Sequence, residues 1–346
     1  MNNDLQSYHD YLLHIFMKKA DTVSSADVRN LKRKKVDIIK AITQSPSVLP
    51  NFPLLHHLSK LRILGSFEGT FYAVLAIEDD YEKYIVKVPV RTSPYSAWEF
   101  AVEKKLNNIF LNFSVPHASV LDFFISSDGR PQWLLQQYVS HESMPFGSHN
   151  PQWAVIQGNA LSGLHKIKGK GFGLLDPKGT LENNIPTGVH GSWRSYIFCN
   201  LDEHVQYLTE NGLIDEYNVS RILKLIEDME ENTFVPTLLH GDPNIKNFLF
   251  YGSKLRAIVD WEDALIGDPV YEIASWVSFY DNYRFLEKFL MGYGETQKST
   301  FLKKLWTYYL RIVTAKAVHN SKFGHSNLER SIQKIQIAIR KLQDIS

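Results

Sequence analysis

The chain has 346 residues, which suits one large domain or two of medium size. Apolar residues make up 44% and charged residues 22%, and this balance excludes a disordered chain, a collagen-like fibre and a coiled-coil rod. The formal net charge of +1 gives no reason to expect a nucleic-acid or membrane partner, and the single cysteine excludes an internal disulfide.

The same features bear on where the protein acts. Its apolar runs fall short of the ~20 residues that cross a bilayer, and its first residues lack the pattern of a secretory signal. We therefore expect a cytoplasmic protein that binds neither membranes nor nucleic acid. The sequence leaves the oligomeric state open.

The first part of the chain is polar and has a helical pattern. Ser25 is a suitable N-cap for a helix over residues 26–43, where apolar residues recur at helical spacing. The prolines that follow end this pattern. We assign residues 1–59 to an N-terminal helical extension.

A small sheet is predicted next, because short segments rich in β-branched and aromatic residues follow one another after residue 60. A helix with one apolar stripe interrupts them over residues 97–110. We assign this sheet and its helix to a first lobe, residues 60–139. The predicted strands are residues 61–64, 70–77, 84–90, 118–125 and 132–139.

The rest of the chain, residues 140–346, is predicted to be mainly helical. One hairpin interrupts it, with strands at residues 248–251 and 255–259. The fold class is therefore α+β, with a small antiparallel sheet lobe, a larger helical lobe and a cleft between them. The predicted helices are residues 153–166, 193–211, 219–231 and a series from residue 271 to the end.

The most informative segment begins at His240 and reads His-Gly-Asp-Pro-Asn-Ile-Lys-Asn. Asp242, Asn247 and, beyond the predicted hairpin, Asp260 can converge on one point. Oxygen ligands of this kind suit a hard cation such as Mg²⁺, which keeps some water ligands and binds substrate phosphates. Each residue alone is more often found in a turn or a cap, so the combination carries the prediction.

This pattern resembles the catalytic and metal-binding loops of the protein-kinase superfamily. Glycine after the histidine, and Asp-Trp in place of Asp-Phe-Gly, are typical of its small-molecule branch, the aminoglycoside phosphotransferases and their choline-kinase-like relatives. The stretches at residues 161–165 and 267–269 are also similar to that family. The resemblance covers roughly residues 61–280, and it implies a bilobal protein-kinase-like fold and ATP-dependent phosphorylation of a small-molecule hydroxyl.

The resemblance also implies roles for residues of the second lobe. Asp242 would be the catalytic residue that orients the acceptor hydroxyl. Asn247 and Asp260 would hold Mg²⁺ against the phosphates of ATP.

In the first lobe, the resemblance implies that Lys87 holds the α- and β-phosphates and that Glu103 orients it. Lys87 interrupts an apolar predicted strand, where an unpaired ammonium group would be costly to bury. Glu103 follows sixteen residues later in the predicted helix, and Glu99, one turn earlier, is the alternative partner. A lysine that extends from an edge strand to solvent is the structural alternative for Lys87.

The remaining nucleotide contacts are predicted from position. Gly65 and Ser66 fall between the first two predicted strands, where this fold covers the phosphates, although an ordinary hairpin turn explains them equally well. Gln137 and Val139 fall where the family joins its lobes, and their backbone would meet the adenine edge.

Two departures from the family pattern stand out. Residues 243–246 read Pro-Asn-Ile-Lys where the family commonly has Leu-His-Pro-Gly, and Glu272 replaces the usual aspartate after Gly-Asp-Pro. Neither change removes a ligand or the base. Both weaken any inference of specificity by analogy.

The acceptor is predicted to be a small cationic molecule. Residues 171–173 and 192–197 resemble the insert of antibiotic-modifying members, including hygromycin-type phosphotransferases, which favours an aminoglycoside-type antibiotic. Residues 181–300 carry 19 acidic and nine basic residues, and solvated helix faces explain this as well as an acidic wall does. Glu262 and Asp263 directly follow Asp260 and are the first candidate acceptor contacts, with capping as an equal alternative.

Other functions stay open at this point. A kinase of a cellular amine or amino sugar, such as a choline-like or fructosamine-like metabolite, would share these motifs. A nucleotide-binding pseudokinase without turnover is disfavoured, because such scaffolds typically lose one of the motif residues. A protein kinase is disfavoured because no Ala-Pro-Glu segment follows Asp260.

Overall fold

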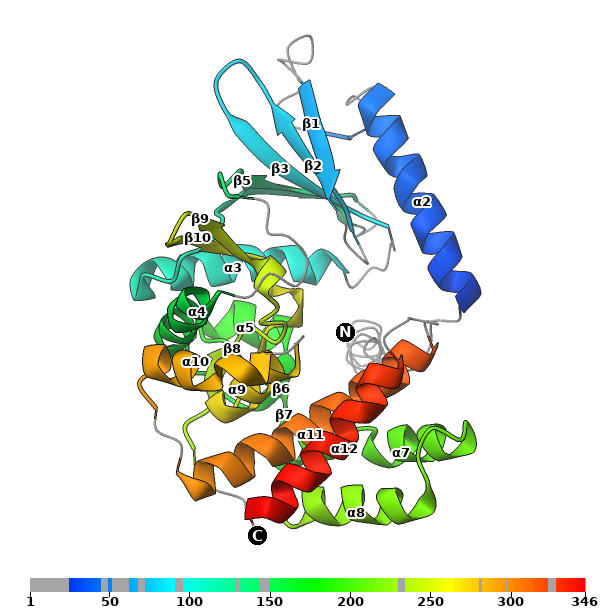
Figure 1. Ribbon diagram of the computed structural model, residues 1–346. Helices are drawn as coiled ribbons and strands as arrows, with labels where there is room; N and C mark the ends of the chain where they lie inside the picture. Colours follow the sequence, from blue (N-terminus) through cyan, green and yellow to red (C-terminus); the bar gives the residue numbers. More distant parts are fainter. Residues whose placement is uncertain are drawn as a thin grey trace.

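The computed structural model describes residues 25–44, 49–51, 62–67, 72–90, 96–127, 131–142, 150–229, 234–279, 282–295, 298–322 and 328–345. These residues form two lobes, with an antiparallel sheet at the top of Figure 1 and a larger, mainly helical lobe below it. The predicted α+β class is confirmed. None of the helices in these ranges is long and apolar enough to cross a membrane.

The smaller lobe is built on a five-stranded antiparallel sheet in the order β1-β2-β3-β5-β4. One helix packs on each face of it, α2 (Ser25–Gln44) and α3 (Ser96–Phe113), both close to their predicted ranges. The strands are β1 (Arg62–Phe67), β2 (Tyr72–Glu78), β3 (Lys83–Pro89), β4 (Val120–Ile125) and β5 (Pro131–Gln137).

Alternate residues of the strands pack on the two helices. Leu75 and Ile77 of β2 pack with Ile42 of α2. Tyr72 of the same strand packs with Phe100 of α3 on the other face. Because successive side chains of a strand point to opposite faces, this sheet is buried on both sides, and the described part of the predicted N-terminal extension belongs to its packing.

Strand β1 runs further than the sequence predicts. The prediction that Gly65 and Ser66 form a loop after this strand is wrong, because Gly65 pairs with Ala76 and Ser66 with Leu75 of β2. A bulge beside Gly65 shifts the register and lets the strand continue, which is a common use of glycine within a strand. Residues 68–71, which lie between the two strands, are outside the described ranges.

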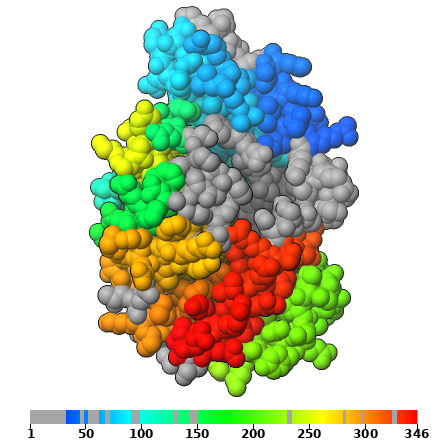
Figure 2. All heavy atoms as spheres, in the orientation of Figure 1, coloured from blue at the N-terminus to red at the C-terminus, as the bar shows by residue number. Residues whose placement is uncertain are grey.

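The larger lobe packs its helices on one apolar core. Helices α11 and α12 pack against each other. In the view of Figure 2, α12 covers much of the larger lobe, beside α7 and α8. The α-helices are α4 (Pro151–Leu164), α5 (Pro177–Asn183), α6 (Trp193–Phe198), α7 (Leu201–Glu210), α8 (Glu216–Glu227), α9 (Pro269–Ser278), α10 (Leu286–Tyr293), α11 (Ser299–Lys322) and α12 (Leu328–Ile345). The 3-10 helices are η3 (Ile245–Asn247), η4 (Trp261–Asp263) and η5 (Asn282–Phe285).

One predicted helix is two helices in the structure. The prediction of a continuous helix over residues 193–211 is wrong, because α6 and α7 are separated at Asn200, whose φ of 56° is left-handed. The buried guanidinium group of Arg311 donates hydrogen bonds to the carbonyl oxygens of Ile197 and Cys199, at 2.6 and 2.7 Å. These bonds satisfy carbonyl groups at the end of α6 and stabilise the break.

A four-stranded sheet in the larger lobe, in the order β7-β6-β11-β8, is absent from the sequence prediction. Its strands have three or four residues, too few to show an alternating pattern. They are β6 (Phe172–Leu175), β7 (Gly188–His190), β8 (Thr237–Leu239) and β11 (Leu265–Gly267).

The predicted hairpin is confirmed as β9 (Phe248–Tyr251) and β10 (Lys254–Ile258). Strand β8 ends immediately before His240, and β10 ends two residues before Asp260. These two strand ends therefore fix the positions of the segments that carry the sequence motif.

Candidate active site

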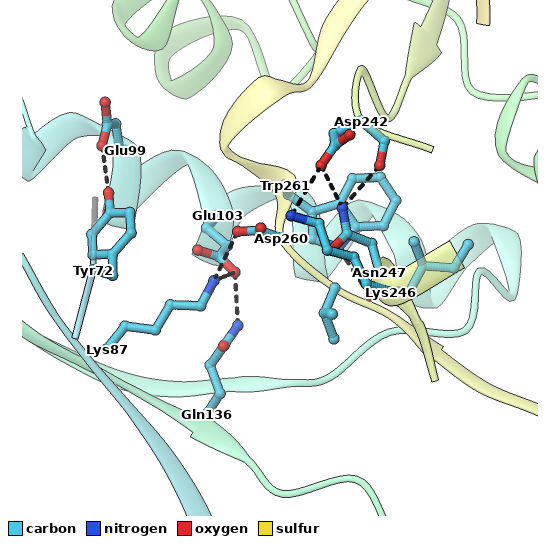
Figure 3. Close-up of polar contacts among 12 residues, drawn as sticks. Tyr72, Lys87, Glu99, Glu103, Gln136, Asp242, Lys246, Asn247, Asp260 and Trp261 are labelled. Carbon is cyan, nitrogen blue, oxygen red and sulfur yellow. Dashed lines mark hydrogen bonds and ion pairs between the residues drawn. The ribbon is translucent and has the colours of Figure 1, made fainter. Parts of the chain in front are cut away.

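Lys87 projects from β3 toward α3, where its Nζ lies 3.3 Å from Glu103 Oε1 (Figure 3). Both side chains are almost buried, and the pairing offsets the cost of burying either charge alone. Gln136 of β5 donates a hydrogen bond of 2.7 Å from Nε2 to the same Glu103 oxygen. Burial acts to lower the pKa of Lys87, but Glu103 and Asp260 outweigh it and raise the pKa, so the ammonium group stays charged.

Glu99, one turn earlier on α3, has a different partner. The hydroxyl of Tyr72 on β2 donates a hydrogen bond of 2.5 Å to Glu99 Oε2. Burial and the neighbouring Glu99 charge raise the pKa of Tyr72 well above 10.0, so this hydroxyl keeps its proton. Of the two candidates from the sequence, the structure therefore pairs Glu103 with Lys87.

The segment after β8 folds into a compact loop around Asp242. Asn247 donates hydrogen bonds from Nδ2 to the backbone carbonyl oxygen and to Oδ2 of Asp242, both at 2.9 Å. Lys246 places its Nζ 3.8 Å from the same Oδ2. The 3-10 helix η3 produces this arrangement, because it returns the chain toward Asp242, and Asn244 caps it by accepting from the Lys246 backbone N–H.

Asp260 follows β10 in a left-handed conformation, with φ 70° and ψ 64°. Aspartate is among the few residues that adopt this conformation outside glycine. Its Oδ1 lies 3.9 Å from Lys87 Nζ, so the structure brings the end of β10 to the Lys87–Glu103 pair.

His240 joins the two motif segments. Its Nε2 donates a hydrogen bond of 2.8 Å to the carbonyl oxygen of Val259, the residue before Asp260. Its Nδ1 accepts a hydrogen bond of 3.3 Å from the backbone N–H of Asp242. The imidazole is buried, so it positions the backbone on both sides and stays away from solvent.

Glu272 of α9 lies buried behind this loop. Its two carboxylate oxygens accept the backbone N–H groups of His240 and Gly241, at 2.7 and 2.8 Å. His165, at the end of α4, donates from Nε2 to Glu272 Oε2 at 3.1 Å. Burial acts to raise the pKa of Glu272, but the interactions with His165 and His240 outweigh it and lower the pKa below 4.5.

From the sequence, Glu272 stands out only as a departure from the family pattern, and His165 and Gln136 have no predicted role. Two features of the sequence could have indicated a role for these residues. Glu272 follows Gly-Asp-Pro, and His165 lies in a stretch that is similar to the family. No sequence signal indicates that Gln136 contacts Glu103, because that contact depends on how two strands and a helix pack.

Gly241 allows the loop to approach η4. It has a φ of 86°, and a Cβ atom there would lie 1.9 Å from the carbonyl oxygen of Asp263. Both the conformation and the space therefore require glycine at this position.

A cavity of about 320 Å³ opens beside Asp242, between α3 of the smaller lobe and helices α9 and α11 of the larger one. Glu262 and Asp263 both line it, so the structure brings these two candidate acceptor residues to the same space as Asp242. The aromatic rings of Tyr271 and Phe279 line it as well. The cavity thus combines carboxylates with aromatic surface.

Gln137 and Val139 lie where β5 leaves the smaller lobe. The N–H of Gln137 donates to the carbonyl oxygen of Ser119 at 2.9 Å, and the carbonyl oxygen of Val139 lies 2.8 Å from His141 Nδ1. Neither residue lines the cavity beside Asp242 within the described part of the chain, and neither do the two β1 residues predicted to cover the phosphates.

Comparison with known proteins identifies the family. The profile of the phosphotransferase enzyme family (APH) matches residues 66–304, more than half of the chain. The chain belongs to this family. Hygromycin-B 4-O-kinase of Escherichia coli is 29% identical to it over 120 residues, and that alignment spans 34% of this chain and only 33% of the relative.

Solved structures share the fold of this phosphotransferase. Aminoglycoside phosphotransferase APH(4)-Ia superposes with a TM-score of 0.60 at 20% identity, covering 82% of this chain and 94% of its own. Ethanolamine kinase of Plasmodium vivax superposes with a TM-score of 0.58 at 14% identity, covering 90% and 89%. At these identities the likeness concerns the fold alone, and it confirms the predicted bilobal kinase-like architecture.

Two oxygen donors of the phosphotransferase could hold a metal ion. The Nδ2 group of Asn247 faces Asp242, so its amide oxygen points away from that residue, and Asp260 supplies a carboxylate. No group of three or more histidine, cysteine, aspartate or glutamate side chains suited to a metal occurs among the described residues. Donors of this chemistry would suit Mg²⁺, because this ion keeps water ligands and binds phosphate oxygens.

Proposed function

We propose that this phosphotransferase transfers the γ-phosphoryl group of ATP to a hydroxyl group of a small molecule. The observation that carries the proposal is that three separate parts of the chain meet at one site. They are the Lys87–Glu103 pair, the loop of Asp242 and Asn247, and the strand end at Asp260. Each has an ordinary structural explanation alone, and their meeting supports a catalytic site.

Asp242 is assigned to the acceptor. Its carboxylate would accept a hydrogen bond from the attacking hydroxyl group and orient it in line with the γ-phosphorus. The two hydrogen bonds from Asn247 fix the position of this residue. Most of the acceleration in phosphoryl transfer comes from positioning and electrostatics, so Asp242 need not be a strong base.

The phosphates of ATP would lie between the lobes. Lys87, held by Glu103, would contact the α- and β-phosphates. Asn247 and Asp260 would hold Mg²⁺, which when bound neutralises charge on the phosphate oxygens. Because the Lys87 ammonium group already lies 3.9 Å from Asp260 Oδ1, both contacts can serve one triphosphate.

The base of the nucleotide would lie against the nucleotide-binding lobe, which we assign to residues 60–139. The backbone of Gln137 and Val139 would meet the adenine edge. Gly65 and Ser66, near the end of β1, would lie over the phosphates. The pairing of β1 with β2 supports this placement, since it holds Gly65 and Ser66 in the same sheet as the strand that carries Lys87.

The acceptor that we propose first is an aminoglycoside-type antibiotic, bound by the larger lobe, residues 140–346. Glu262 and Asp263 add two carboxylates to the cavity beside Asp242, which suits an acceptor with several ammonium groups. The similarity to hygromycin-B 4-O-kinase supports the same class of acceptor.

A kinase of a cellular amine or amino sugar is the second candidate. Tyr271 lines the same cavity, and an aromatic face suits one ammonium group. The shared chemistry is a hydroxyl compound that carries positive charge.

A turnover screen tests both candidates. Purified full-length chain with Mg-ATP is incubated with aminoglycosides, choline, ethanolamine and amino sugars, while ADP release and phosphorylated products are measured. Phosphorylation of an aminoglycoside supports the first candidate, and phosphorylation of a simple amine or amino sugar alone supports the second. ATP binding without any product would overturn the proposal and favour a pseudokinase.

A further inference from the structure

Lys246 lies beside Asp242 and has no part in the family pattern described above. Residues 243–246 replace a sequence that commonly ends in glycine, so this ammonium group is a feature of the chain itself. The 3-10 helix η3 turns the side chain back toward the loop, and Nζ lies 3.8 Å from Asp242 Oδ2 (Figure 3). A cation therefore stands next to the carboxylate that we assign to the acceptor hydroxyl.

Exposure distinguishes Lys246 from the other lysine of the site. The side chain of Lys246 is 63% exposed, whereas that of Lys87 is 10% exposed. The ammonium group of Lys87 is held by Glu103 of α3. Asp242 Oδ2 already accepts a hydrogen bond from Asn247, so Lys246 can leave it without exposing an unsatisfied buried oxygen.

We propose that Lys246 is a further catalytic residue, which contacts the γ-phosphoryl group during transfer. This inference rests on the proposed function. A phosphoryl group placed in line with a hydroxyl at Asp242 must lie within reach of an ammonium group 3.8 Å from that carboxylate. The transferring group carries negative charge on three equatorial oxygens, and an ammonium group there stabilises the transition state.

The transfer step balances with Lys246 acting only through charge. The bond from the acceptor oxygen to the γ-phosphorus forms, and the bond from that phosphorus to the β–γ bridging oxygen breaks. ADP leaves with the electron pair, and the hydroxyl proton passes to Asp242. Movement of Lys246 from Asp242 to a phosphoryl oxygen would at the same time leave the carboxylate open to the hydroxyl.

The competing explanation is an ordinary surface ion pair between residues four apart, which contributes little to stability. That explanation predicts a small change in thermal stability when Lys246 is replaced. It predicts no change in how the site binds the transferred group. The two explanations therefore differ in a measurable way.

Binding of ADP with aluminium fluoride provides a test that needs no acceptor, because the fluoride complex mimics the transferring phosphoryl group. With Mg²⁺ present, the unmodified protein should bind ADP more tightly when aluminium fluoride is added. In Lys246→Met, the increase in ADP affinity caused by aluminium fluoride should be smaller by about tenfold or more, while the affinity for ADP alone stays the same. Lys246→Arg keeps the charge and should keep most of the gain. Lys254→Met, on the exposed hairpin, is the matched control and should match the unmodified protein.

Turnover with the acceptor found in the screen gives a second measurement. In Lys246→Met, kcat should fall by about a hundredfold with little change in the KM for ATP. An unchanged aluminium fluoride gain, or a kcat within about twofold of the unmodified protein, would overturn the inference. If ADP affinity and thermal stability both fall in Lys246→Met, Lys246 has a structural role, and this result would also overturn the inference. Failure of the unmodified protein to bind ADP would instead overturn the proposed function.

Discussion

His240 donates a hydrogen bond of 2.8 Å from Nε2 to the carbonyl oxygen of Val259, and this contact joins the loop of Asp242 to the strand end that carries Asp260. The backbone N–H of His240 is in turn held from behind by Glu272, at 2.7 Å. The two carboxylates assigned to the acceptor and the metal are therefore positioned through one buried residue. Residues that never touch a substrate set the geometry of the site.

Replacement of Glu272 should destabilise the protein. Glu272→Gln puts an NH₂ group where a carboxylate accepts backbone N–H groups and His165, so buried donors lose their partner. We expect the free energy of unfolding to fall by about 2–4 kcal/mol, measured by urea denaturation at pH 7. Glu287→Gln, on the exposed side of α10, is the control and should change it by less than about 0.5 kcal/mol. Equal effects of the two variants would contradict the role of Glu272.

The same carboxylate makes stability depend on pH. Burial acts to raise the pKa of Glu272, but His165 and His240 lower it below 4.5 in the folded protein. A group whose pKa is lower when folded adds stability above its unfolded pKa, and this contribution is lost as the pH falls through the folded pKa. The free energy of unfolding should therefore decrease as the pH falls below 4.5, and it should decrease less steeply in Glu272→Gln. Parallel curves for the two proteins would contradict this prediction.

The pairing of Lys87 predicts which glutamate matters for catalysis. Lys87→Ala should lower kcat/KM for ATP by about a hundredfold or more, because the phosphates lose their positioning group. Glu103→Ala should have a similar effect, since it removes the partner 3.3 Å from Lys87 Nζ. Glu99→Ala should retain most of the activity, because Glu99 accepts from Tyr72 instead. A larger loss in Glu99→Ala than in Glu103→Ala would contradict the pairing.

Two glycines with positive φ test whether the close contact between the Asp242 loop and η4 requires glycine. Gly241→Ala should lower the free energy of unfolding by about 3 kcal/mol or more and abolish turnover, because a Cβ there overlaps the carbonyl oxygen of Asp263. Gly252→Ala, in the β9–β10 turn, has a φ of 56° but open space around the Cβ, and it should cost only about 1–2 kcal/mol. Similar costs at the two positions would show that backbone conformation alone explains Gly241.

Charge at the cavity predicts that acceptor binding depends on salt. Glu262 and Asp263 line the cavity, where both are half-buried, and the attraction of a charged acceptor from solvent is screened over about 10 Å at 0.1 M ionic strength. The KM for a polycationic acceptor should rise with salt, and it should rise less in Glu262→Gln combined with Asp263→Asn. A KM that salt does not change would contradict a polycationic acceptor and leave the phosphotransfer chemistry in place.

The parts of the site that could be predicted are those with a local or regular sequence signal. Asp242 and Asn247 are five residues apart on one turn, and Lys87 interrupts an apolar strand sixteen residues before Glu103. The structure places both pairs within contact distance. The α+β class followed in the same way from the change between strand-like and helical patterns.

The remaining features depend on packing between segments that are distant in the sequence. Gln136 reaches Glu103 only because β5 lies beside β3, and His165 reaches Glu272 across 107 residues. The strand at Gly65 continues through a bulge, and the helix predicted over residues 193–211 breaks where Arg311 binds its carbonyl groups. The local sequence propensity of each segment cannot predict these contacts.

The most direct test of the central claim compares the unmodified protein with Asp242→Asn in one assay. Each is incubated with Mg-ATP and the acceptor found in the screen, ATP affinity is measured by calorimetry, and the acceptor is analysed by mass spectrometry. The unmodified protein should add one phosphoryl group to the acceptor for each ADP released. Asp242→Asn should bind ATP with an affinity within about threefold of the unmodified protein. It should form product at least about a thousandfold more slowly, because the neutral amide lacks the negative charge that holds the hydroxyl group and accepts its proton. Near-normal product formation by folded Asp242→Asn would contradict the account of this site.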